Sequence, residues 1–272
     1  MKKNILVIGG GGAKGAYAVG LLTMWNESYD KYYGTSTGAL IAPLVALGKY
    51  DELKEAYLSL SNESIYSVNP FNKKGKISKM NAIKRMLRKK NSFGESDKLK
   101  DLIKKYYTEA DHNKLRFTQT EVVVTVTNMT TNTTGYVSNL KTNYESFVEC
   151  IWTSTLAYPF TALNGVFADG GYSSPVPIVR ACKDNPNANI DIIVLDTEKD
   201  EVFNPEGLLD SIPSIINELL RTLFIKDKGY AKHLARENDI RLSYHYTPYS
   251  LTDNSMQFNK RDMKNWYNLG RK

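Results

Sequence analysis

The chain has 272 residues, of which 42% are hydrophobic and 24% charged. This is enough apolar material for a full-sized α/β core, and the composition excludes an intrinsically disordered chain. The two cysteines, Cys150 and Cys182, are too few for a disulfide framework, and no Cys/His cluster has zinc spacing. No apolar run approaches the roughly 18 residues that span a bilayer, so any membrane contact is expected to be peripheral.

The first residues imitate a secretory signal without completing one. The apolar stretch is only Ile5 to Ile8, and glycines follow where a longer apolar region and a cleavage site would stand. Together with the low cysteine content, this predicts a cytoplasmic protein in a reducing compartment.

The net charge of +7 is unevenly distributed. Between Phe71 and Tyr106 there are 13 Lys or Arg and three acidic residues, a local charge of +10, so the remainder carries about −3. A concentrated basic segment suggests an anionic partner, either lipid headgroups or nucleic acid. The segment lacks interleaved aromatic residues before Phe93 and any recognised nucleic-acid motif, so we expect no nucleic-acid binding.

Strands and helices are predicted to alternate along the chain. The apolar run at residues 4–8 ends in glycines, as a buried parallel strand does. Further strands are expected at 31–34, 117–128, near 136, 165–168, 190–195 and 240–246. Helices are expected at 15–25, 39–47, 51–60, 77–90, 97–107, 144–156, 207–237 and the C-terminus, with a loop at 62–75. Pro43 predicts a kink or a late start in the second helix.

This alternation predicts an α/β fold, with a mainly parallel central sheet between two helical layers. No linker separates two complete cores. Residues 1–272 are therefore expected to form a single domain, in which 62–110 are a basic helical insertion or lid.

The first of three motifs is a glycine cluster directly after the first strand. Its Gly10-x-Gly12-x-x-Gly15 spacing matches the dinucleotide fingerprint, and Asp30 lies 20 residues beyond Gly10, where a ribose-binding acid would be sought. A Walker loop is excluded, because Lys14 precedes its glycine. The alternative without a ligand is a tight strand-to-helix turn.

The second motif, Gly34-Thr-Ser36-Thr-Gly38, is the GxSxG pattern of a nucleophile elbow at a strand-to-helix junction. Small flanking residues allow the sharp turn that presents Ser36 above the sheet, and the following helix N-terminus favours negative charge nearby. A Ser/Thr turn that merely caps a helix is the simpler alternative.

The third motif, Asp169-Gly170-Gly171, follows a short strand and by itself is a common turn. In their order and context, the three motifs resemble the patatin-like phospholipase family, which has a GGGx(K/R)G loop, then GxSxG, then DGG or DGA. The resemblance covers nearly the whole chain, and the stretch from Ser154 to Phe160 resembles the family's approach to its catalytic aspartate.

The resemblance implies a lipid acyl hydrolase, such as a phospholipase A or a lysophospholipase. Ser36 would be the nucleophile and Asp169 its base, in a dyad without histidine that forms a covalent acyl-enzyme. The backbone N–H groups of Gly10, Gly11 and Gly12 would form the oxyanion hole. Lys14 would either orient that loop or lie in solvent. No metal or cofactor is required, and calcium should be dispensable.

Three alternatives stay open at this point. Ser36, Asp169 or Asp196, and His233 or His245 stand in the order of an α/β-hydrolase triad, although that fold places more strands before its elbow. A dinucleotide-binding protein would explain only the first glycine cluster. The third alternative is a non-catalytic lipid-surface protein with the same fold.

The basic segment contains a candidate membrane helix at 77–90. Its apolar residues recur at spacings of three to four, whereas Lys84, Arg85, Arg88 and Lys89 occupy much of the other side. Those apolar residues are Ile77, Met80, Ile83, Met86 and Leu87. We expect residues 71–106 either to dock on an anionic membrane near the site or to form an ordinary surface helix.

Overall fold

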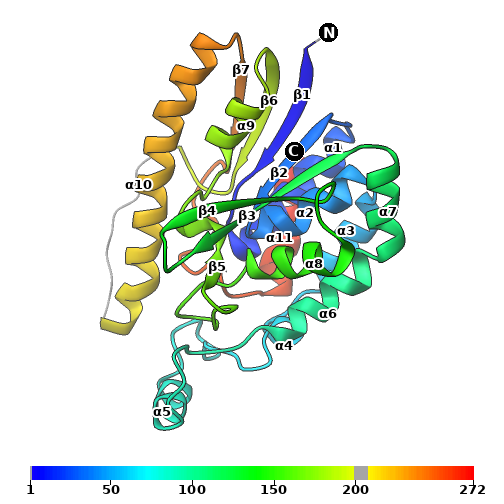
Figure 1. The fold of residues 1–272 in the computed structure, drawn as a ribbon. Helices are drawn as coiled ribbons and strands as arrows, with labels where there is room; N and C mark the ends of the chain where they lie inside the picture. The colour runs from blue at the N-terminus through cyan, green and yellow to red at the C-terminus, as the bar shows by residue number, and fades with distance from the viewer. Residues whose placement is uncertain (1, 199–207) are drawn as a thin grey trace.

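The computed structural model describes residues 2–198 and 208–272 around a seven-stranded sheet with the order β4-β3-β2-β1-β6-β7, in which β5 also pairs with β3 (Figure 1). The pairs joining β3, β2, β1, β6 and β7 are all parallel, and β4 and β5 run antiparallel to β3. The strands are β1 (Lys3–Ile8), β2 (Lys31–Thr35), β3 (Glu121–Asn128), β4 (Thr133–Ser138), β5 (Phe167–Asp169), β6 (Ala188–Val194) and β7 (Arg241–Tyr246).

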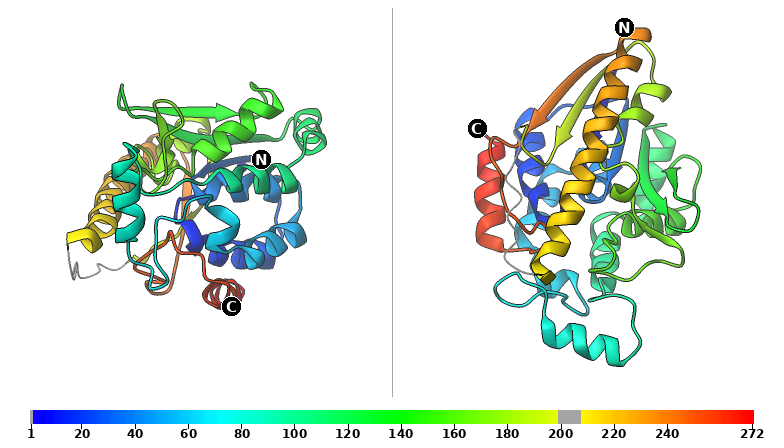
Figure 2. Two further views of the ribbon diagram at one scale, coloured as in Figure 1. Left: turned by 90° about the horizontal axis from the view of Figure 1, so that it is seen from below. Right: turned by 90° about the vertical axis from the view of Figure 1, so that its left-hand side faces the viewer.

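Helices cover both faces of this sheet (Figures 1 and 2). The α-helices are α1 (Gly15–Trp25), α2 (Thr37–Ala46), α3 (Tyr50–Ser59), α4 (Asn62–Ile65), α5 (Lys79–Leu87), α6 (Asp97–Tyr106), α7 (Glu109–Phe117), α8 (Tyr144–Thr153), α9 (Ile178–Asp184), α10 (Leu208–Glu237) and α11 (Lys260–Gly270). Within the described residues, none is long and apolar enough to cross a membrane.

Alternate side chains of the central strands fill two separate cores. Leu6 and Ile8 of β1 pack with α1, α2, α3 and α8, whereas Ile5 and Val7 of the same strand pack with α9 and α10. A strand whose two faces are both buried reads as a continuous apolar run, as NILVI does. The predicted three-layer α/β/α arrangement with a mainly parallel sheet is therefore confirmed.

Several predicted boundaries were wrong for local reasons. The strand expected from Phe117 begins at Glu121, because residues up to Phe117 belong to helix α7. This helix starts at a capping box formed by Thr108 and Asp111. The loop expected at 62–75 contains the single turn α4, and α9 was not predicted.

Other boundaries moved by a few residues. Helix α2 begins immediately after Ser36 and continues through Pro43, so the late start did not occur. The helix expected at 77–90 is limited to α5 by the N-cap at Ser78. Strand β5 is shifted toward Asp169, and residue 207 of the expected 207–237 helix lies outside the described residues.

Residues 62–110 contribute α4, α5, α6 and the start of α7, and no described strand of the sheet. Helix α5 projects from the body at the bottom of Figure 1. This placement supports the proposal of one domain with an inserted basic segment, and we retain it as a proposal.

The junction of β1, β2 and α2 leaves no room for side chains. A Cβ atom on Gly34 would lie 2.3 Å from the carbonyl oxygen of Gly38, and one on Gly38 would lie 2.1 Å from that of Ile8. Real Cβ atoms do not approach backbone oxygens so closely. The glycines of GxSxG are therefore needed for packing of backbone against backbone.

We expect Gly38→Ala to lower the free energy of unfolding by about 1–3 kcal/mol or more, because the added methyl group overpacks the junction. Urea unfolding measures this loss. Gly229→Ala is the matched control, since a Cβ there meets nothing within 4 Å. In the interior of α10, that change should be neutral or stabilising by about 1 kcal/mol. Equal stability of the two variants would show that the junction tolerates a side chain.

Candidate active site

Ser36 occupies the turn between β2 and α2 in a strained conformation. Its φ of 54° and ψ of −119° cost a non-glycine residue on the order of 1–3 kcal/mol. The N–H of Ser36 donates a 2.8 Å hydrogen bond to Oγ of the buried Ser154. The hydroxyl of Thr35 donates to the carbonyl oxygen of Ser174 at 3.0 Å. Neighbouring segments thus hold the sharp turn that the GxSxG spacing predicts.

The sheet brings Asp169 to the same place. β2 pairs with β3 as far as Thr35 opposite Thr125, and then Ser36 leaves the sheet. One residue further along β3, Val126 pairs with Asp169 of β5. Because β4 occupies the other edge of β3, β5 takes the edge that β2 has left. Residues 133 positions apart in sequence thereby become neighbours.

The carboxyl group of Asp169 is buried, and the residue is only 8% exposed. Burial raises its pKa to about 6, because the charged form loses its hydration. Hydrogen bonds from the Ser36 side chain and from the Gly171 N–H, the latter 2.7 Å long, lower the pKa in part. The Ser36 side chain therefore lies close enough to Asp169 to lower the pKa of its carboxyl group, which still ionises near neutral pH.

The glycine loop lies beside Ser36, and its amides differ in availability. The N–H of Gly10 donates to the carbonyl oxygen of Pro175 at 2.9 Å, so this amide is already engaged. The N–H groups of Gly11 and Gly12 form no hydrogen bond with the described part of the chain. Of the three N–H groups predicted for the oxyanion hole, those of Gly11 and Gly12 are therefore available to a ligand, and that of Gly10 is not.

The peptide group between Gly12 and Ala13 is held from two sides. The hydroxyl of Thr37 donates to the carbonyl oxygen of Gly12 at 2.7 Å, and the N–H of Ala13 donates to the carbonyl oxygen of Ser255 at 2.7 Å. Ser255 belongs to a C-terminal segment, residues 250–257, that crosses the glycine loop. These contacts fix the orientation of the neighbouring amides.

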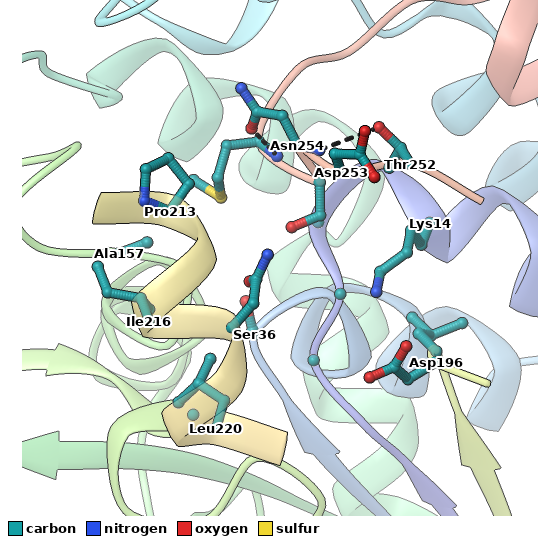
Figure 3. A pocket seen from close by; sticks show the side chains of 18 of the residues that line it. Lys14, Ser36, Ala157, Asp196, Pro213, Ile216, Leu220, Thr252, Asp253 and Asn254 are labelled. Carbon is teal, nitrogen blue, oxygen red and sulfur yellow. Dashed lines mark hydrogen bonds between the residues drawn. The ribbon is translucent and has the colours of Figure 1, made fainter. Parts of the chain in front are cut away.

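A cavity of about 730 Å³ opens over Ser36, Asp169 and the glycine loop. Figure 3 shows Pro213, Ile216 and Leu220 of α10 on one side. Residues of the C-terminal segment and Lys14 lie on the other side. Its apolar lining includes Ile77, Ala157, Phe160, Val176, Val194, Leu195, Pro213, Ile216, Leu220, Phe224 and Met256. This size and mixed lining suit a small-molecule or lipid ligand.

The remaining motif residues have structural positions around this cavity. Lys14 is half-buried and directed into the cavity alongside Asp196 (Figure 3), so it does not lie in bulk solvent. Gly15 begins α1, and Gly170 and Gly171 form the turn after Asp169. A role for Lys14 in orienting the loop remains a proposal.

The three histidines lie away from the cavity, and none is among its lining residues. His112 is buried between Tyr107 and the carbonyl oxygen of Thr142. His245 of the edge strand β7 contacts Asp191 of the neighbouring strand β6, and His233 pairs with Glu237 along α10. Among the described residues, no histidine therefore lies beside Ser36 to complete a Ser-Asp-His triad.

Asp30 is also in the wrong place for a dinucleotide site. It precedes β2 and accepts a 2.7 Å hydrogen bond from the N–H of Asn4, which places it at the amino end of the strands. The glycine loop is at the opposite, carboxyl end of β1, where such sites bind ribose and pyrophosphate. The dinucleotide interpretation therefore lacks its acidic residue.

Sequence reasoning did not identify Thr37, Pro175 or Ser255 as parts of the site. Pro175 and Ser255 act through backbone carbonyl groups, so their residue types carry no signal. Thr37 lies inside the GxSxG motif, where its hydroxyl is compatible with a simple helix start.

Comparisons with known proteins agree with the motifs. A family model described as patatin-like phospholipase matches residues 6–181. A cUMP-AMP-activated phospholipase from Escherichia coli is 40% identical over 63 residues, which are 20% of each chain. The crystal structure of VipD from Legionella pneumophila aligns with 99% of this chain and 65% of that one, with 13% identity and a TM-score of 0.45. The chain thus matches less than two thirds of the length of either protein.

The family model spans more than half of the chain and includes all three motifs, from the glycine loop through Ser36 to Asp169. The glycine loop, Ser36 and Asp169 thus all come from one continuous region of family similarity, whereas α10 and residues 250–257 of the cavity lie beyond it. The chain belongs to the patatin-like phospholipase family.

Proposed function

We propose that the protein hydrolyses fatty-acyl esters of phospholipids or lysophospholipids, with Ser36 as nucleophile and Asp169 as general base. The observation that carries this proposal is that Ser36 and the buried Asp169 line the same cavity of about 730 Å³, where the Ser36 side chain lowers the pKa of the Asp169 carboxyl group. A base with a pKa near 6 is ionised at neutral pH and is more basic than an ordinary carboxylate.

In the first half of the reaction, the Ser36 oxygen attacks the ester carbonyl carbon, and its proton passes to Asp169. The tetrahedral intermediate carries its negative charge on the former carbonyl oxygen. When it collapses, the ester C–O bond breaks and the protonated Asp169 gives its proton to the departing alcohol. An acyl group is then attached to Ser36.

In the second half, Asp169 accepts a proton from water, and the water oxygen attacks the acyl carbon. Collapse releases the fatty acid and returns the proton to the Ser36 oxygen. The N–H groups of Gly11 and Gly12 would stabilise the oxyanion in both halves, aided by the helix N-terminus beside Ser36. The scheme uses no metal or cofactor.

The lining of the cavity supports a lipid substrate. Apolar side chains from α10 and β6 offer a surface for an acyl chain. Lys74, Lys76 and Arg221 are cationic groups for a phosphate headgroup, in a lining that also contains the acidic residues Asp196, Glu218 and Asp253. We also propose that the basic segment, residues 71–106, brings the enzyme to anionic membranes, since its charge of +10 attracts them.

We expect Ser36→Ala to abolish ester hydrolysis and to prevent labelling by a fluorophosphonate probe, while the fold is retained. The change removes the nucleophile and little packing. Gel-based labelling and a phospholipid panel with mass-spectrometric detection of fatty acid measure the effect, and circular dichroism checks the fold. A folded variant with comparable activity would refute the assignment, and an unlabelled wild-type protein would favour a non-catalytic lipid-surface role.

We expect Asp169→Asn to be about as inactive as Ser36→Ala, because an amide accepts no proton and catalytic partners act as a unit. His233→Ala and His245→Ala should keep most of the activity. In the wild type, kcat/KM should fall as the pH drops through about 6, where Asp169 becomes protonated. An inactive histidine variant beside a mildly affected Asp169→Asn would instead establish a triad.

Asp169→Asn should also stabilise the protein at neutral pH. The pKa of Asp169 is raised from 3.8 to about 6 on folding, so ionisation opposes folding by up to about 3 kcal/mol. This penalty is absent below pH 3.8, grows between 3.8 and about 6, and is complete above 6. Thermal melts should therefore show Asp169→Asn gaining stability over the wild type from pH 4 to pH 7.

Asp184→Asn is the control with the opposite sign. Burial alone would raise the pKa of Asp184, but hydrogen bonds from Arg180 and Tyr33 and the nearby charge of Lys31 hold it below its usual range. Its stabilising contribution is present above pH 3.8 and is lost as the pH falls through the depressed pKa. Asp184→Asn should thus be destabilised throughout pH 5–8, and parallel behaviour of the two variants would contradict the opposite pKa shifts.

Thr37→Val should lower kcat by roughly tenfold and leave KM nearly unchanged, because Gly12 loses the hydrogen bond that orients its peptide group. Thr37→Ser keeps the hydroxyl and should restore most of the turnover. Steady-state kinetics on a soluble ester separates the two constants. Equal turnover in both variants would remove this positioning role.

A further inference from the structure

Helix α5 stands out from the body of the protein (Figure 1), and polar side chains on one of its sides bind neighbouring segments. The amide of Asn81 donates to the carbonyl oxygen of Asn69 at 2.9 Å. Arg85 is only 8% exposed, and its guanidinium group donates to the backbone and hydroxyl oxygens of Ser92 and to the Glu95 carboxylate. Arg85 does lie on the side opposite the apolar residues, as the spacing predicts, but it is buried there and anchors the helix.

The opposite side of α5 is apolar and exposed. Met80 is 64% exposed, Ile83 54%, Met86 70% and Leu87 77%, and we call these four residues the apolar ridge. Successive residues of an α-helix are turned by about 100°, so the ridge lies opposite Asn81 and Arg85. A surface helix of a water-soluble protein normally has the reverse orientation. Such a patch marks an interaction surface.

Cationic side chains surround the apolar ridge. Lys79, Lys84, Arg88, Lys89 and Lys90 are all exposed, and no acidic residue occurs between Phe71 and Gly94. Exposed apolar side chains flanked by lysine and arginine are complementary to an anionic bilayer, with its phosphates outside and its acyl chains inside. The charge pattern therefore selects a lipid surface as the occupant of the ridge.

The position of the apolar ridge connects it with the cavity. Residues 74–77, which precede α5, line the cavity. The Leu208 end of α10 lies at the same end of the molecule (Figures 1 and 2), and its first turns also line the cavity. Ile215 and Leu219 of these turns are 48% and 64% exposed. Exposed apolar groups thus occur on two elements that border the cavity.

We infer that the apolar ridge inserts into the acyl layer of anionic membranes while the surrounding cations bind lipid phosphates, which sets the cavity mouth against the bilayer. This inference deepens the proposed function by naming how the site reaches its substrate. Its link to hydrolysis rests on the proposed function, whereas membrane binding itself does not. Inserted apolar groups add a contribution to binding that salt does not screen.

The first test measures binding to vesicles of phosphatidylcholine with phosphatidylglycerol across a salt series. All proteins carry Ser36→Ala, so that lipid is not consumed and the result does not depend on hydrolysis. A variant with Met80, Ile83, Met86 and Leu87 each changed to Gln keeps the charge and the helix propensity. At high salt, we expect about tenfold or more loss of binding relative to the parent.

The matched control changes exposed apolar side chains elsewhere, Met24→Gln on α1 and Phe117→Gln on α7, which are 47% and 89% exposed. This control should bind like its parent. A charge variant, with Lys84, Arg88 and Lys89 changed to Gln, should lose binding mainly at low salt. Equal binding of the ridge variant and its parent at every salt concentration would overturn the inference.

The second test reads insertion directly. Ile83→Trp should show a blue shift of its fluorescence on anionic vesicles, with quenching by brominated acyl chains, whereas Phe117→Trp should show neither. An unquenched Ile83→Trp signal would overturn insertion. Sedimentation without lipid tests whether a second copy of the chain covers the apolar ridge instead. A dimer that dissociates with the four Gln substitutions, in a protein that binds no vesicles, would assign the ridge to a second copy.

Hydrolysis of a water-soluble short-chain ester distinguishes failure of this inference from failure of the proposed function. With Ser36 present, the four Gln substitutions should leave that activity unchanged and lower hydrolysis of vesicle phospholipid by a factor similar to the loss of binding. If no ester is cleaved by any variant, the proposed function fails while the binding result stands.

Discussion

The site depends on the contact at which β1, β2 and α2 meet through their backbones. With glycine at positions 34 and 38, the first turn of α2 lies against the ends of two strands, with no side chain between them. This close approach determines where the chain turns at Ser36, and hence where the hydroxyl group lies relative to Asp169. The strained φ and ψ angles of Ser36 are maintained by the surrounding hydrogen bonds, in particular the one to Ser154.

Burial of the Asp169 carboxylate opposes folding, and it also makes this group more basic than an ordinary carboxylate. The carboxylate loses hydration and recovers only part of that loss from Ser36 and Gly171. The two apolar cores on either side of the sheet supply the stability that tolerates this cost. A buried group that is unfavourable for folding is characteristic of a functional site, so the raised pKa of Asp169 supports a functional role for this residue.

Much of the fold was predictable, because it follows from local patterns. The continuous apolar run of β1 and the branched residues of β3 identified the central strands, and the glycine positions located the turns between strands and helices. The candidate pair Ser36 and Asp169 came from motif order and from resemblance to a family. Their contact could not be derived from the sequence, because it depends on β5 taking the free edge of β3 beyond Thr35.

The features that were missed have physical causes of a different kind. Amphipathic spacing in residues 77–90 shows that α5 has two unlike faces, but it does not show which face is turned inward. That orientation is decided by Arg85, whose partners Ser92 and Glu95 come from the following loop. Backbone acceptors such as Ser255 are likewise invisible in sequence, because every residue has a carbonyl group.

The segment at residues 250–257 has a consequence for the order in which the protein matures. The glycine loop is among the first parts of the chain to be synthesised, but the carbonyl group of Ser255 that holds its Ala13 amide is made much later. A nascent chain therefore contains Ser36 and Asp169 before the loop beside them is fixed. A product that ends before Ser255 would carry Ser36 and Asp169 beside a glycine loop that lacks this hydrogen bond.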